Sequence, residues 1–351
     1  MAFPTGWAYY EVITLPAVSG MSVDAVLSNF PFPITNLSAA VYANARSDGG
    51  DIRFTTADGV TEIPVEIVSF DAVGNTAEIW IKAPTVSQAT TNDVRVYYGA
   101  PSETMPPANS TYGSQNVWDA NFKGVYHLGE AVNNVADGYK DSTANANHMT
   151  GYSMSIAASV GKIGYAQNFD GVSSYLERLT PLVTAAPLTF SAWSLVHLAG
   201  LGAIVATTAT DGGESFLLYT DTDNIYRYLT RAVDISTSAV CSSAFTIDTW
   251  HHVAGKSEAA NSRSVLMDGA NKGLDTVSKV PGAMDSTHIG RWSSADSYPF
   301  NGSIDEVRIS NIARSDDWLY AEYWTAANQT AITPGRVSLL SGLLTRRKLV
   351  A

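Results

Sequence analysis

The sequence predicts an all-β protein built from two β-sandwich domains, and three observations lead to this fold class. Short runs of β-branched and aromatic residues alternate with Gly, Asn and Asp turns along the chain. Residues 7–100 contain no segment with the 3.6-residue apolar period of a helix. The chain has 351 residues, which is more than one β-sandwich needs.

The first domain is expected over residues 1–100. Asp58-Gly59 and Gly74-Asn75 predict tight turns in it, because Gly and Asn tolerate positive φ. Residues 101–117 are predicted to be a linker, since they combine three prolines with small polar residues. The strands expected in the first domain cover residues 9–15, 51–55, 63–69, 76–82 and 93–98.

The second domain is expected over residues 118–330, where the strand pattern resumes. One helix is predicted after Ser315, because Asp316 and Asp317 place negative charge at its N-terminus and Trp318, Ala321 and Glu322 follow at helical spacing. The expected strands cover residues 124–128, 166–170, 188–197, 203–208, 215–219, 250–256, 264–267, 288–291 and 302–310.

Residues 331–351 differ in character from the rest and are predicted to be a C-terminal tail. The tail is leucine-rich and then basic, and Val337, Leu340 and Leu344 would share one face of a helix. The segment 337–351 is therefore a candidate docking segment for a partner protein. The alternative is a disordered tail, because Gly342 and the short length make an isolated helix marginal.

Composition and charge exclude several classes of function. The formal net charge of −12 repels phosphate backbones and anionic lipids, so neither nucleic-acid nor membrane-surface binding is expected. No apolar run approaches the about 20 residues of a membrane span. Cys241 is the single cysteine and is predicted to be a buried apolar residue rather than a nucleophile. The first residues lack the pattern of a signal peptide, which predicts synthesis and folding in a cytoplasm.

Three groups of residues, in order along residues 118–328, resemble the laminin-G/pentraxin branch of the concanavalin A-like superfamily. The resemblance implies that the second domain is a concanavalin A-like jelly roll with one short helix near its C-terminal end. The groups are residues 124–130 with 141–148, residues 164–171 with 188–193, and residues 249–254 with 267–269, 300–310 and 313–318.

The first domain resembles the family catalogued as domain of unknown function 2341. This resemblance spans nearly all of residues 6–100 and implies a β-sandwich that precedes lectin-like domains. It implies no chemistry. The residues that carry it are 50–59, 63–66, 77–82 and 96–99.

The sequence predicts that the protein is not an enzyme. Glucanases of the resembling superfamily align carboxylates as Glu-x-Asp-x-Glu on one strand, and this motif occurs nowhere in the chain. The nearest match is Asp305-Glu306. In a regular strand, adjacent side chains point to opposite faces, so this pair is not expected to act on one sugar.

The loop that begins at Asp141 has alternating oxygen-bearing residues of the kind that Ca²⁺ prefers. The resemblance implies that Asp141, Asn145 and Asn147, together with Asp305, hold a structural calcium ion. The alternative is a loop closed by the Asp141 side chain without a metal.

Trp292 and Tyr298 flank a polar loop between two expected strands. An exposed aromatic ring there would stack on a sugar face, while Arg291 and Asp296 would hydrogen-bond sugar hydroxyls. These four residues are the predicted carbohydrate site. The alternative is that Trp292 covers the rim of the sandwich.

These expectations predict a structural protein of a bacteriophage virion, either a capsid decoration or a tail or fibre component. It would contact other virion proteins and bind host-surface carbohydrate through its lectin-like domain. The alternative is an extracellular or cell-surface module of a secreted bacterial adhesin or polysaccharide-degrading enzyme.

Overall fold

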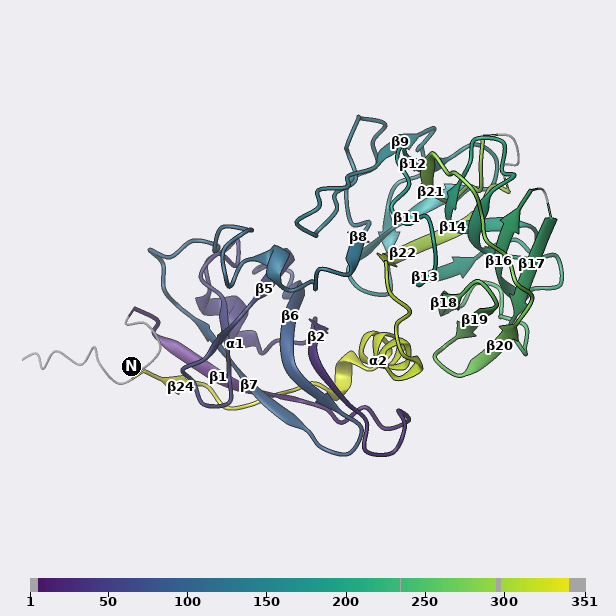
Figure 1. Ribbon diagram of the computed structural model, residues 1–351. Helices are drawn as coiled ribbons and strands as arrows, with labels where there is room; N and C mark the ends of the chain where they lie inside the picture. Colours follow the sequence, from purple (N-terminus) through teal and green to yellow (C-terminus); the bar gives the residue numbers. More distant parts are fainter. Residues whose placement is uncertain (1–5, 234, 295–297, 341–351) are drawn as a thin grey trace, which may run out of the picture. The chain divides into compact units, whose positions relative to one another are not determined.

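The computed structural model describes residues 6–233, 235–294 and 298–340, and its chain forms two compact units (Figure 1). The first unit takes the residues up to Ser19, Val23–Val117 and the chain from Asn328 onward. The second takes Gly20–Ser22 and Trp118–Ala327. In sequence order, the second unit is therefore inserted into the first.

The first unit contains a six-stranded sheet and a three-stranded sheet. The larger sheet has the order β23-β1-β7-β3-β4, with β24 also paired to β1, and the smaller has the order β2-β6-β5. The elements are β1 (Tyr9–Leu15), β2 (Val26–Ile34), α1 (Ala39–Asn44), β3 (Arg53–Thr56), β4 (Glu62–Ile63), β5 (Val65–Asp71), β6 (Thr76–Ser87), β7 (Asn92–Tyr98), η1 (Ser114–Asn116), η2 (Gln329–Ala331), β23 (Thr333–Pro334) and β24 (Ser338–Leu339).

The expected strands of this unit form, but strands β2, β23 and β24 were not predicted. Strand β2 contains Pro31 and Pro33, which in the sequence favour a break rather than a strand. The structure accommodates both prolines because β2 is an edge strand that pairs only with β6 in its sheet, so a missing N–H costs no ladder bond on the open side.

Asp51 links two segments that carry the family resemblance of this unit. Its side chain accepts hydrogen bonds of 2.8 Å from the backbone N–H groups of Gly99 and Ala100. Gly99 has φ +81°, a conformation that favours glycine. The buried carboxylate of Asp51 thus holds the turn that follows β7.

The sequence predicts a linker over residues 101–117. In the structure this segment is hydrogen-bonded to the first unit. The backbone N–H of Val65 donates to the carbonyl oxygen of Tyr112 (3.2 Å), and the Arg46 side chain donates to the carbonyl oxygen of Pro101 (3.0 Å). Prolines remove donors but not acceptors, so this segment satisfies its carbonyl groups against neighbouring side chains and strands.

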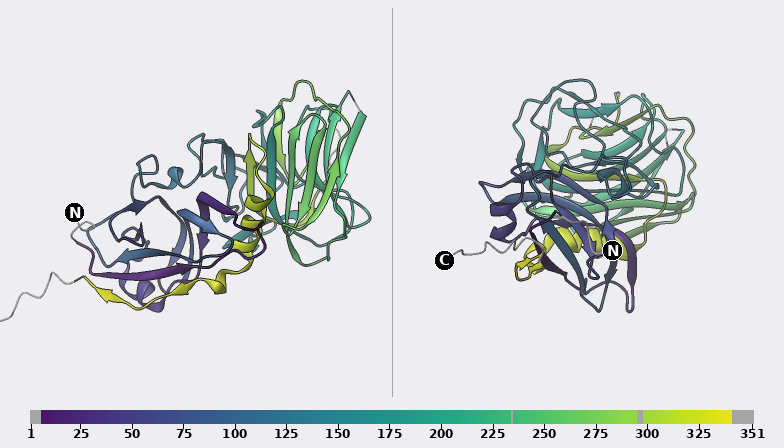
Figure 2. Two further views of the ribbon diagram at one scale, coloured as in Figure 1. Left: turned by 60° about the horizontal axis from the view of Figure 1, so that its bottom comes forward. Right: turned by 90° about the vertical axis from the view of Figure 1, so that its left-hand side faces the viewer.

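The C-terminal segment also differs from the expectation of a separate tail with a helix over Val337 and Leu340. Strands β23 and β24 pair antiparallel with β1, and Figure 1 and the left view of Figure 2 show the yellow segment beside the purple strand. Extended backbone forms here because β1 offers an open edge whose groups the segment satisfies. Leu344 and the rest of residues 341–351 lie outside the described residues.

The second unit consists of two facing antiparallel sheets of eight and seven strands (Figure 2, left). The eight-stranded sheet has the order β10-β11-β22-β13-β18-β19-β20, with β8 also paired to β22, and the seven-stranded sheet has the order β17-β16-β15-β14-β21-β12-β9. The elements are β8 (Phe122–Tyr126), β9 (Thr150–Tyr152), β10 (Ser159–Val160), β11 (Tyr165–Asp170), β12 (Tyr175–Arg178), β13 (Leu188–Val196), β14 (Gly202–Thr208), β15 (Ser215–Thr220), β16 (Tyr226–Ala232), β17 (Ile235–Val240), β18 (Trp250–Ala259), β19 (Ser262–Met267), β20 (Asn271–Asp275), β21 (Ser286–Ile289), β22 (Asn301–Ser310) and α2 (Asp316–Ala327).

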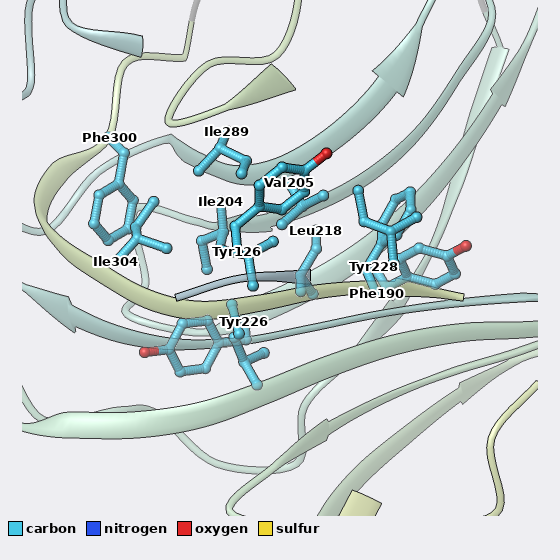
Figure 3. Packing of buried hydrophobic residues seen from close by; sticks show 14 of the residues in the cluster. Tyr126, Phe190, Ile204, Val205, Leu218, Tyr226, Tyr228, Ile289, Phe300 and Ile304 are labelled. Carbon is cyan, nitrogen blue, oxygen red and sulfur yellow. The ribbon is translucent and has the colours of Figure 1, made fainter. Parts of the chain in front are cut away.

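The core of this unit lies between the two sheets (Figure 3). Phe190 and Ile304 come from the eight-stranded sheet, and Leu218, Tyr228 and Ile289 come from the seven-stranded sheet. Each is fully buried, as the alternation of inward and outward residues along a strand requires. This sandwich confirms the predicted all-β fold class.

Strand β22 departs from simple alternation. Ile304 and Val307 both reach the core although an odd number of positions separates them. A β-bulge opposite β13 explains this, and Glu306 within it has φ +51°. The side chains of Asp305 and Glu306 therefore lie on the same, outward side of the strand, contrary to the regular alternation that the sequence analysis assumes.

Helix α2 begins where the sequence predicts. The side chain of Ser315 accepts a hydrogen bond of 3.1 Å from the backbone N–H of Trp318, and Asp316 and Asp317 occupy the first turn. The sequence-predicted helix is thus confirmed. Within the described ranges, no helix has the length and apolar character needed to cross a membrane.

Candidate functional site

The outward face of the seven-stranded sheet carries a group of polar and aromatic side chains that is our candidate binding site. Leu176 and Ile289 point into the core, so Tyr175, Glu177 and His288, next to them in sequence, point outward. Strands β12 and β21 pair side by side, with Glu177 opposite His288. The register of three neighbouring strands thus gathers these side chains near one end of the sheet.

An aromatic pair forms the centre of this group. Tyr152 and Tyr175 are direct partners across β9 and β12, and their rings stack with centroids 4.9 Å apart and an interplanar angle of 10°. Tyr152 is 37% exposed, so its ring is open to solvent on the edge strand. The guanidinium carbon of Arg291 lies 4.4 Å from the centroid of the Tyr175 ring.

A surface hollow of about 260 Å³ adjoins this pair. Tyr175, Arg291 and Pro299 line it together with the serines at positions 153, 173 and 174. Its wall thus combines an aromatic ring, a cation and hydroxyl groups. This is the combination of apolar surface and few polar groups that binding sites for small polar ligands use.

The electrostatics of the site exclude His288 as a cation at neutral pH. Burial, with Arg291 nearby, lowers the pKa of His288 to about 4. Its Nε2 lies 2.9 Å from the Ser286 hydroxyl and 3.8 Å from a carboxylate oxygen of Glu177, and the latter contact is therefore not an ion pair near pH 7. Burial, together with Glu177, raises the pKa of Tyr152, which keeps this phenol protonated.

Trp292 does not form the exposed platform that the sequence predicts. It is 3% exposed and packs on Leu217 and Leu229 of the seven-stranded sheet, and its indole N–H donates to the Ser215 hydroxyl at 2.9 Å. The Tyr298 ring lies 5.0 Å from it. Trp292 thus covers the sheet, because its large apolar surface gains more from burial than from exposure.

Of the other residues predicted to bind carbohydrate, Arg291 belongs to the Tyr175 site described above. Asp296 lies outside the described residues. The sequence analysis missed Tyr152 and Tyr175 as site residues. The two tyrosines are far apart in the sequence and form no local motif. The one available signal is strand alternation, since Tyr175 precedes the core residue Leu176 and therefore points outward.

The loop of Asp141 is closed by hydrogen bonds. One carboxylate oxygen accepts from the backbone N–H groups of Val125 (3.0 Å) and Thr143 (2.9 Å), and the other accepts from the Thr143 hydroxyl (2.8 Å) and the N–H of Asn147 (2.8 Å). This is the arrangement that the metal-free alternative predicts. Asn145 donates to the carbonyl oxygen of Phe122 at 2.9 Å.

Asn147 donates to the carbonyl oxygen of Lys123 at 2.7 Å. Asp141, Asn145 and Asn147, three of the four predicted calcium ligands, thus lie in one loop. Asp305 is engaged with a different loop, where one carboxylate oxygen accepts from the N–H groups of Lys162 (2.7 Å) and Ile163 (3.0 Å). A cation at Asp141 would have to compete with four hydrogen bonds, which favours the metal-free alternative. Calcium binding stays a prediction.

Glu306 belongs to a buried network of charges. Its carboxylate contacts His127 Nδ1 at 2.7 Å and Arg308 Nη2 at 3.0 Å, and Arg308 Nη1 lies 3.4 Å from Glu322. Asp305 and Glu306 are 0% and 2% exposed. Although the bulge places both on one side of β22, neither carboxylate is open to a sugar in this structure.

Cys241 is buried, as the sequence predicts. Burial, with Asp268 as a smaller influence, raises the pKa of its thiol to about 12. Since the thiolate is the reactive form, Cys241 is not an activated nucleophile.

Family models match part of each of the two regions of the chain. Residues 169–319 match the concanavalin A-like lectin/glucanases superfamily. Residues 48–119 match a domain of unknown function, number 2341. The chain thus carries the two predicted types of region in the predicted order. A search of curated proteins found no match.

The solved structures that resemble part of this chain include complexes with carbohydrates. Domain 4 of AbnA, a GH43 extracellular arabinanase from Geobacillus stearothermophilus, in complex with arabinotriose, is 22% identical over 58% of this chain and 98% of its own, with a TM-score of 0.47. The Ruminococcus gnavus IT-sialidase CBM40 bound to alpha2,3 sialyllactose is 16% identical over 40% and 84%, with a TM-score of 0.36. A botulinum neurotoxin serotype D binding domain is 10% identical over 58% and 51%, with a TM-score of 0.43. Each of these TM-scores lies below 0.5, so the similarities carry no argument about the fold or a ligand of this chain.

Proposed function

We propose that the second unit binds carbohydrate, without cleaving it, at the outward face formed by Tyr152, Tyr175 and Arg291. The observation that carries this proposal is the solvent-open Tyr152–Tyr175 stack with a guanidinium 4.4 Å from the Tyr175 ring, beside a hollow of about 260 Å³. In chemical terms, the apolar face of a sugar ring stacks on an aromatic side chain while its hydroxyls bond to polar groups.

The side chains around the stack match these needs. Arg291 uses its Nε to donate to the carbonyl oxygen of Ser293 at 2.6 Å, and the described residues supply no hydrogen-bond acceptor to its two Nη atoms. These Nη–H groups are the donors that we propose for sugar oxygens. The serines at positions 153 and 173 add hydroxyls that both donate and accept. A general acid and a nucleophile at bonding distance are not part of this arrangement, which favours binding over hydrolysis.

A shallow site of this kind binds weakly, with a dissociation constant of roughly a millimolar, so function requires many copies. A virion supplies such copies, and we propose that the chain is a virion-associated structural protein that contacts other virion proteins. Since Ser338–Leu339 pairs with β1, the candidate docking segment is the part of residues 337–351 that follows Leu340. A module of a secreted bacterial adhesin or polysaccharide-degrading enzyme is the second candidate. Mass spectrometry of purified particles and of the secreted fraction separates the two, and a chain that ends after Leu340 tests the docking segment.

The test of carbohydrate binding is a glycan array probed with multimerised protein. The informative variant is Tyr175→Ala, which removes the ring between Tyr152 and Arg291. Tyr165→Ala is the matched control, since Tyr165 is a 55% exposed tyrosine on β11 of the other sheet. We expect wild type and Tyr165→Ala to bind the same glycans and Tyr175→Ala to lose them. Binding that survives Tyr175→Ala would move the site elsewhere, and absence of binding by the wild type would refute the function.

A further inference from the structure

A second hollow lies beside the proposed site and has a different chemical character. It measures about 160 Å³, and the loop between β13 and β14 forms one wall of it with Leu198, Gly200 and Leu201. Leu198 is 66% exposed and Leu201 is 39% exposed, so two leucines face solvent at the rim of the sandwich. These two side chains give the hollow an apolar wall.

The two hollows are neighbours. Pro299 lines both, and Gly171 of the second precedes Val172 of the first. Main-chain hydrogen bonds join the loops concerned, from Gly171 N–H to Phe300 O (2.9 Å) and from His197 N–H to Asn301 O (3.0 Å). The second hollow therefore keeps a defined position next to the first.

The sizes indicate that one ligand occupies both hollows. At about 260 and 160 Å³, each hollow is smaller than the range of roughly 300–1,000 Å³ that is usual for ligand pockets, whereas the two together reach it. A single terminal sugar on the Tyr152–Tyr175 stack would leave the second hollow empty. A ligand with at least two linked sugars would extend past Pro299 into it.

The polar groups of the second hollow select the substituent. Asn301 uses its Nδ2 to donate to the carbonyl oxygen of Asp170 at 3.3 Å, and the described residues supply no donor to its Oδ1. The hydrogen bonds of the described chain likewise leave the backbone N–H groups of residues 198–201 without an acceptor. The residues that line the hollow thus supply an amide oxygen, backbone N–H groups with no acceptor among the described residues, and an apolar wall. An acetamido group presents the complement of each, namely an N–H, a carbonyl oxygen and a methyl group.

We infer that the ligand is an oligosaccharide that contains an N-acetylated hexosamine, with its acetamido group in the hollow formed by Leu198, Leu201 and Asn301. This inference rests on the proposed function, which places the neighbouring sugar in the hollow beside the Tyr152–Tyr175 stack. The apolar wall covers the methyl group, and Asn301 with the loop backbone bonds the amide.

The experiment uses isothermal titration calorimetry with the full chain and compares two trisaccharides. These are N,N′,N″-triacetylchitotriose, called chitotriose below, and cellotriose, which carries hydroxyls in place of the acetamido groups at C2. Chitotriose should bind on the order of tenfold more tightly, because one methyl group is buried and one amide hydrogen-bonded. N-acetylglucosamine alone should bind more weakly than chitotriose, since it fills one hollow. Equal affinity for the two trisaccharides would overturn the inference.

Variants separate this inference from the proposed function. Leu198→Ser should reduce the affinity for chitotriose to that for cellotriose, whereas Leu274→Ser, at a 70% exposed leucine on β20, should change neither. Gly200→Phe should have the same effect as Leu198→Ser, because a Cβ at Gly200 meets nothing within 4 Å and its ring can occupy the hollow without disturbing the fold. Tyr175→Ala should abolish binding of both probes. If Leu198→Ser leaves the preference intact, the acetamido site is refuted while carbohydrate binding stands.

Discussion

Arg314 and Asp119 form a two-point ion pair that joins the two ends of the second unit. Arg314 Nη1 and Nη2 lie 2.7 and 3.0 Å from the two carboxylate oxygens of Asp119. The same guanidinium lies 4.1 Å from the centroid of Phe122 and 4.5 Å from that of Trp318. Burial by itself would raise the pKa of Asp119, and Arg314 instead holds that pKa below its usual value. The pair therefore fastens the start of β8 to the start of α2.

Arg314→Lys is expected to destabilise the second unit by about 2 kcal/mol, because lysine keeps the charge but loses the two-point geometry and the ring stacking. The measurement is urea denaturation followed by tryptophan fluorescence. Arg227→Lys is the control, since Arg227 pairs with the exposed Asp223 in the same unit. It should leave the transition unchanged. Equal effects of the two substitutions would contradict the role assigned to Arg314.

The stability of the second unit should fall with acid because of Glu322. Burial by itself would raise the pKa of this carboxylate, but Arg308 and His252 lower it to about 2. Its folded-state pKa thus lies below the unfolded value of about 4.5, so ionised Glu322 stabilises the fold above that value and loses this effect as pH falls toward 2. The contribution is on the order of 3 kcal/mol.

The check is the melting temperature between pH 7 and pH 3 for wild type and Glu322→Gln. The variant should be less stable at pH 7 and should lose less stability on acidification. A variant with the wild-type slope would show that other carboxylates control the acid response.

Chelation is expected to leave the melting temperature unchanged, because the carboxylate of Asp141 already accepts four hydrogen bonds from the chain. Asp141→Asn should lower it, since an amide oxygen cannot replace both carboxylate oxygens as acceptors. The measurement is the melting temperature by differential scanning calorimetry, with EDTA and with added Ca²⁺. A rise with Ca²⁺ that Asp141→Asn removes would establish the calcium site that the sequence resemblance implies.

Removal of the chain from Asn328 onward is expected to destabilise the first unit. Ile332 is buried, Gly335 donates its N–H to the carbonyl oxygen of Val12 at 2.7 Å, and β23 and β24 cover the edge of β1. A chain that ends after Leu340 keeps every one of these contacts and is the control. Thermal unfolding of both proteins, with the transition of the first unit followed by amide hydrogen exchange in β1, should show protection lost only in the shorter chain.

The protein should release no reducing sugar from β-glucans, even at high concentration. One carboxylate oxygen of Glu306 contacts a ring nitrogen of His127, and the other accepts a hydrogen bond from Arg308. Asp305 is fully buried. A reducing-sugar assay tests this expectation. Activity that Glu306→Gln abolishes would show that these carboxylates become accessible and catalytic.

Local patterns in the sequence determined the fold class and most strands of this protein. Tyr9–Leu15 and the N-terminus of α2 at Ser315 follow from alternation and from helix capping, which act between residues close in the chain. The sequence also predicted, as an alternative, that the Asp141 side chain closes its loop without calcium, because this closure involves mainly residues close together in the chain.

Tertiary structure alone decided the features that depend on pairing between distant segments. The stack of Tyr152 on Tyr175 arises from the register of β9 on β12, and the bulge at Glu306 arises from the pairing of β22 with β13. Trp292 is covered because the seven-stranded sheet offers an apolar face, and β24 is extended because β1 has an open edge. Strand pairing and burial satisfy backbone and apolar groups collectively, so a local pattern cannot specify which distant segment supplies the partner.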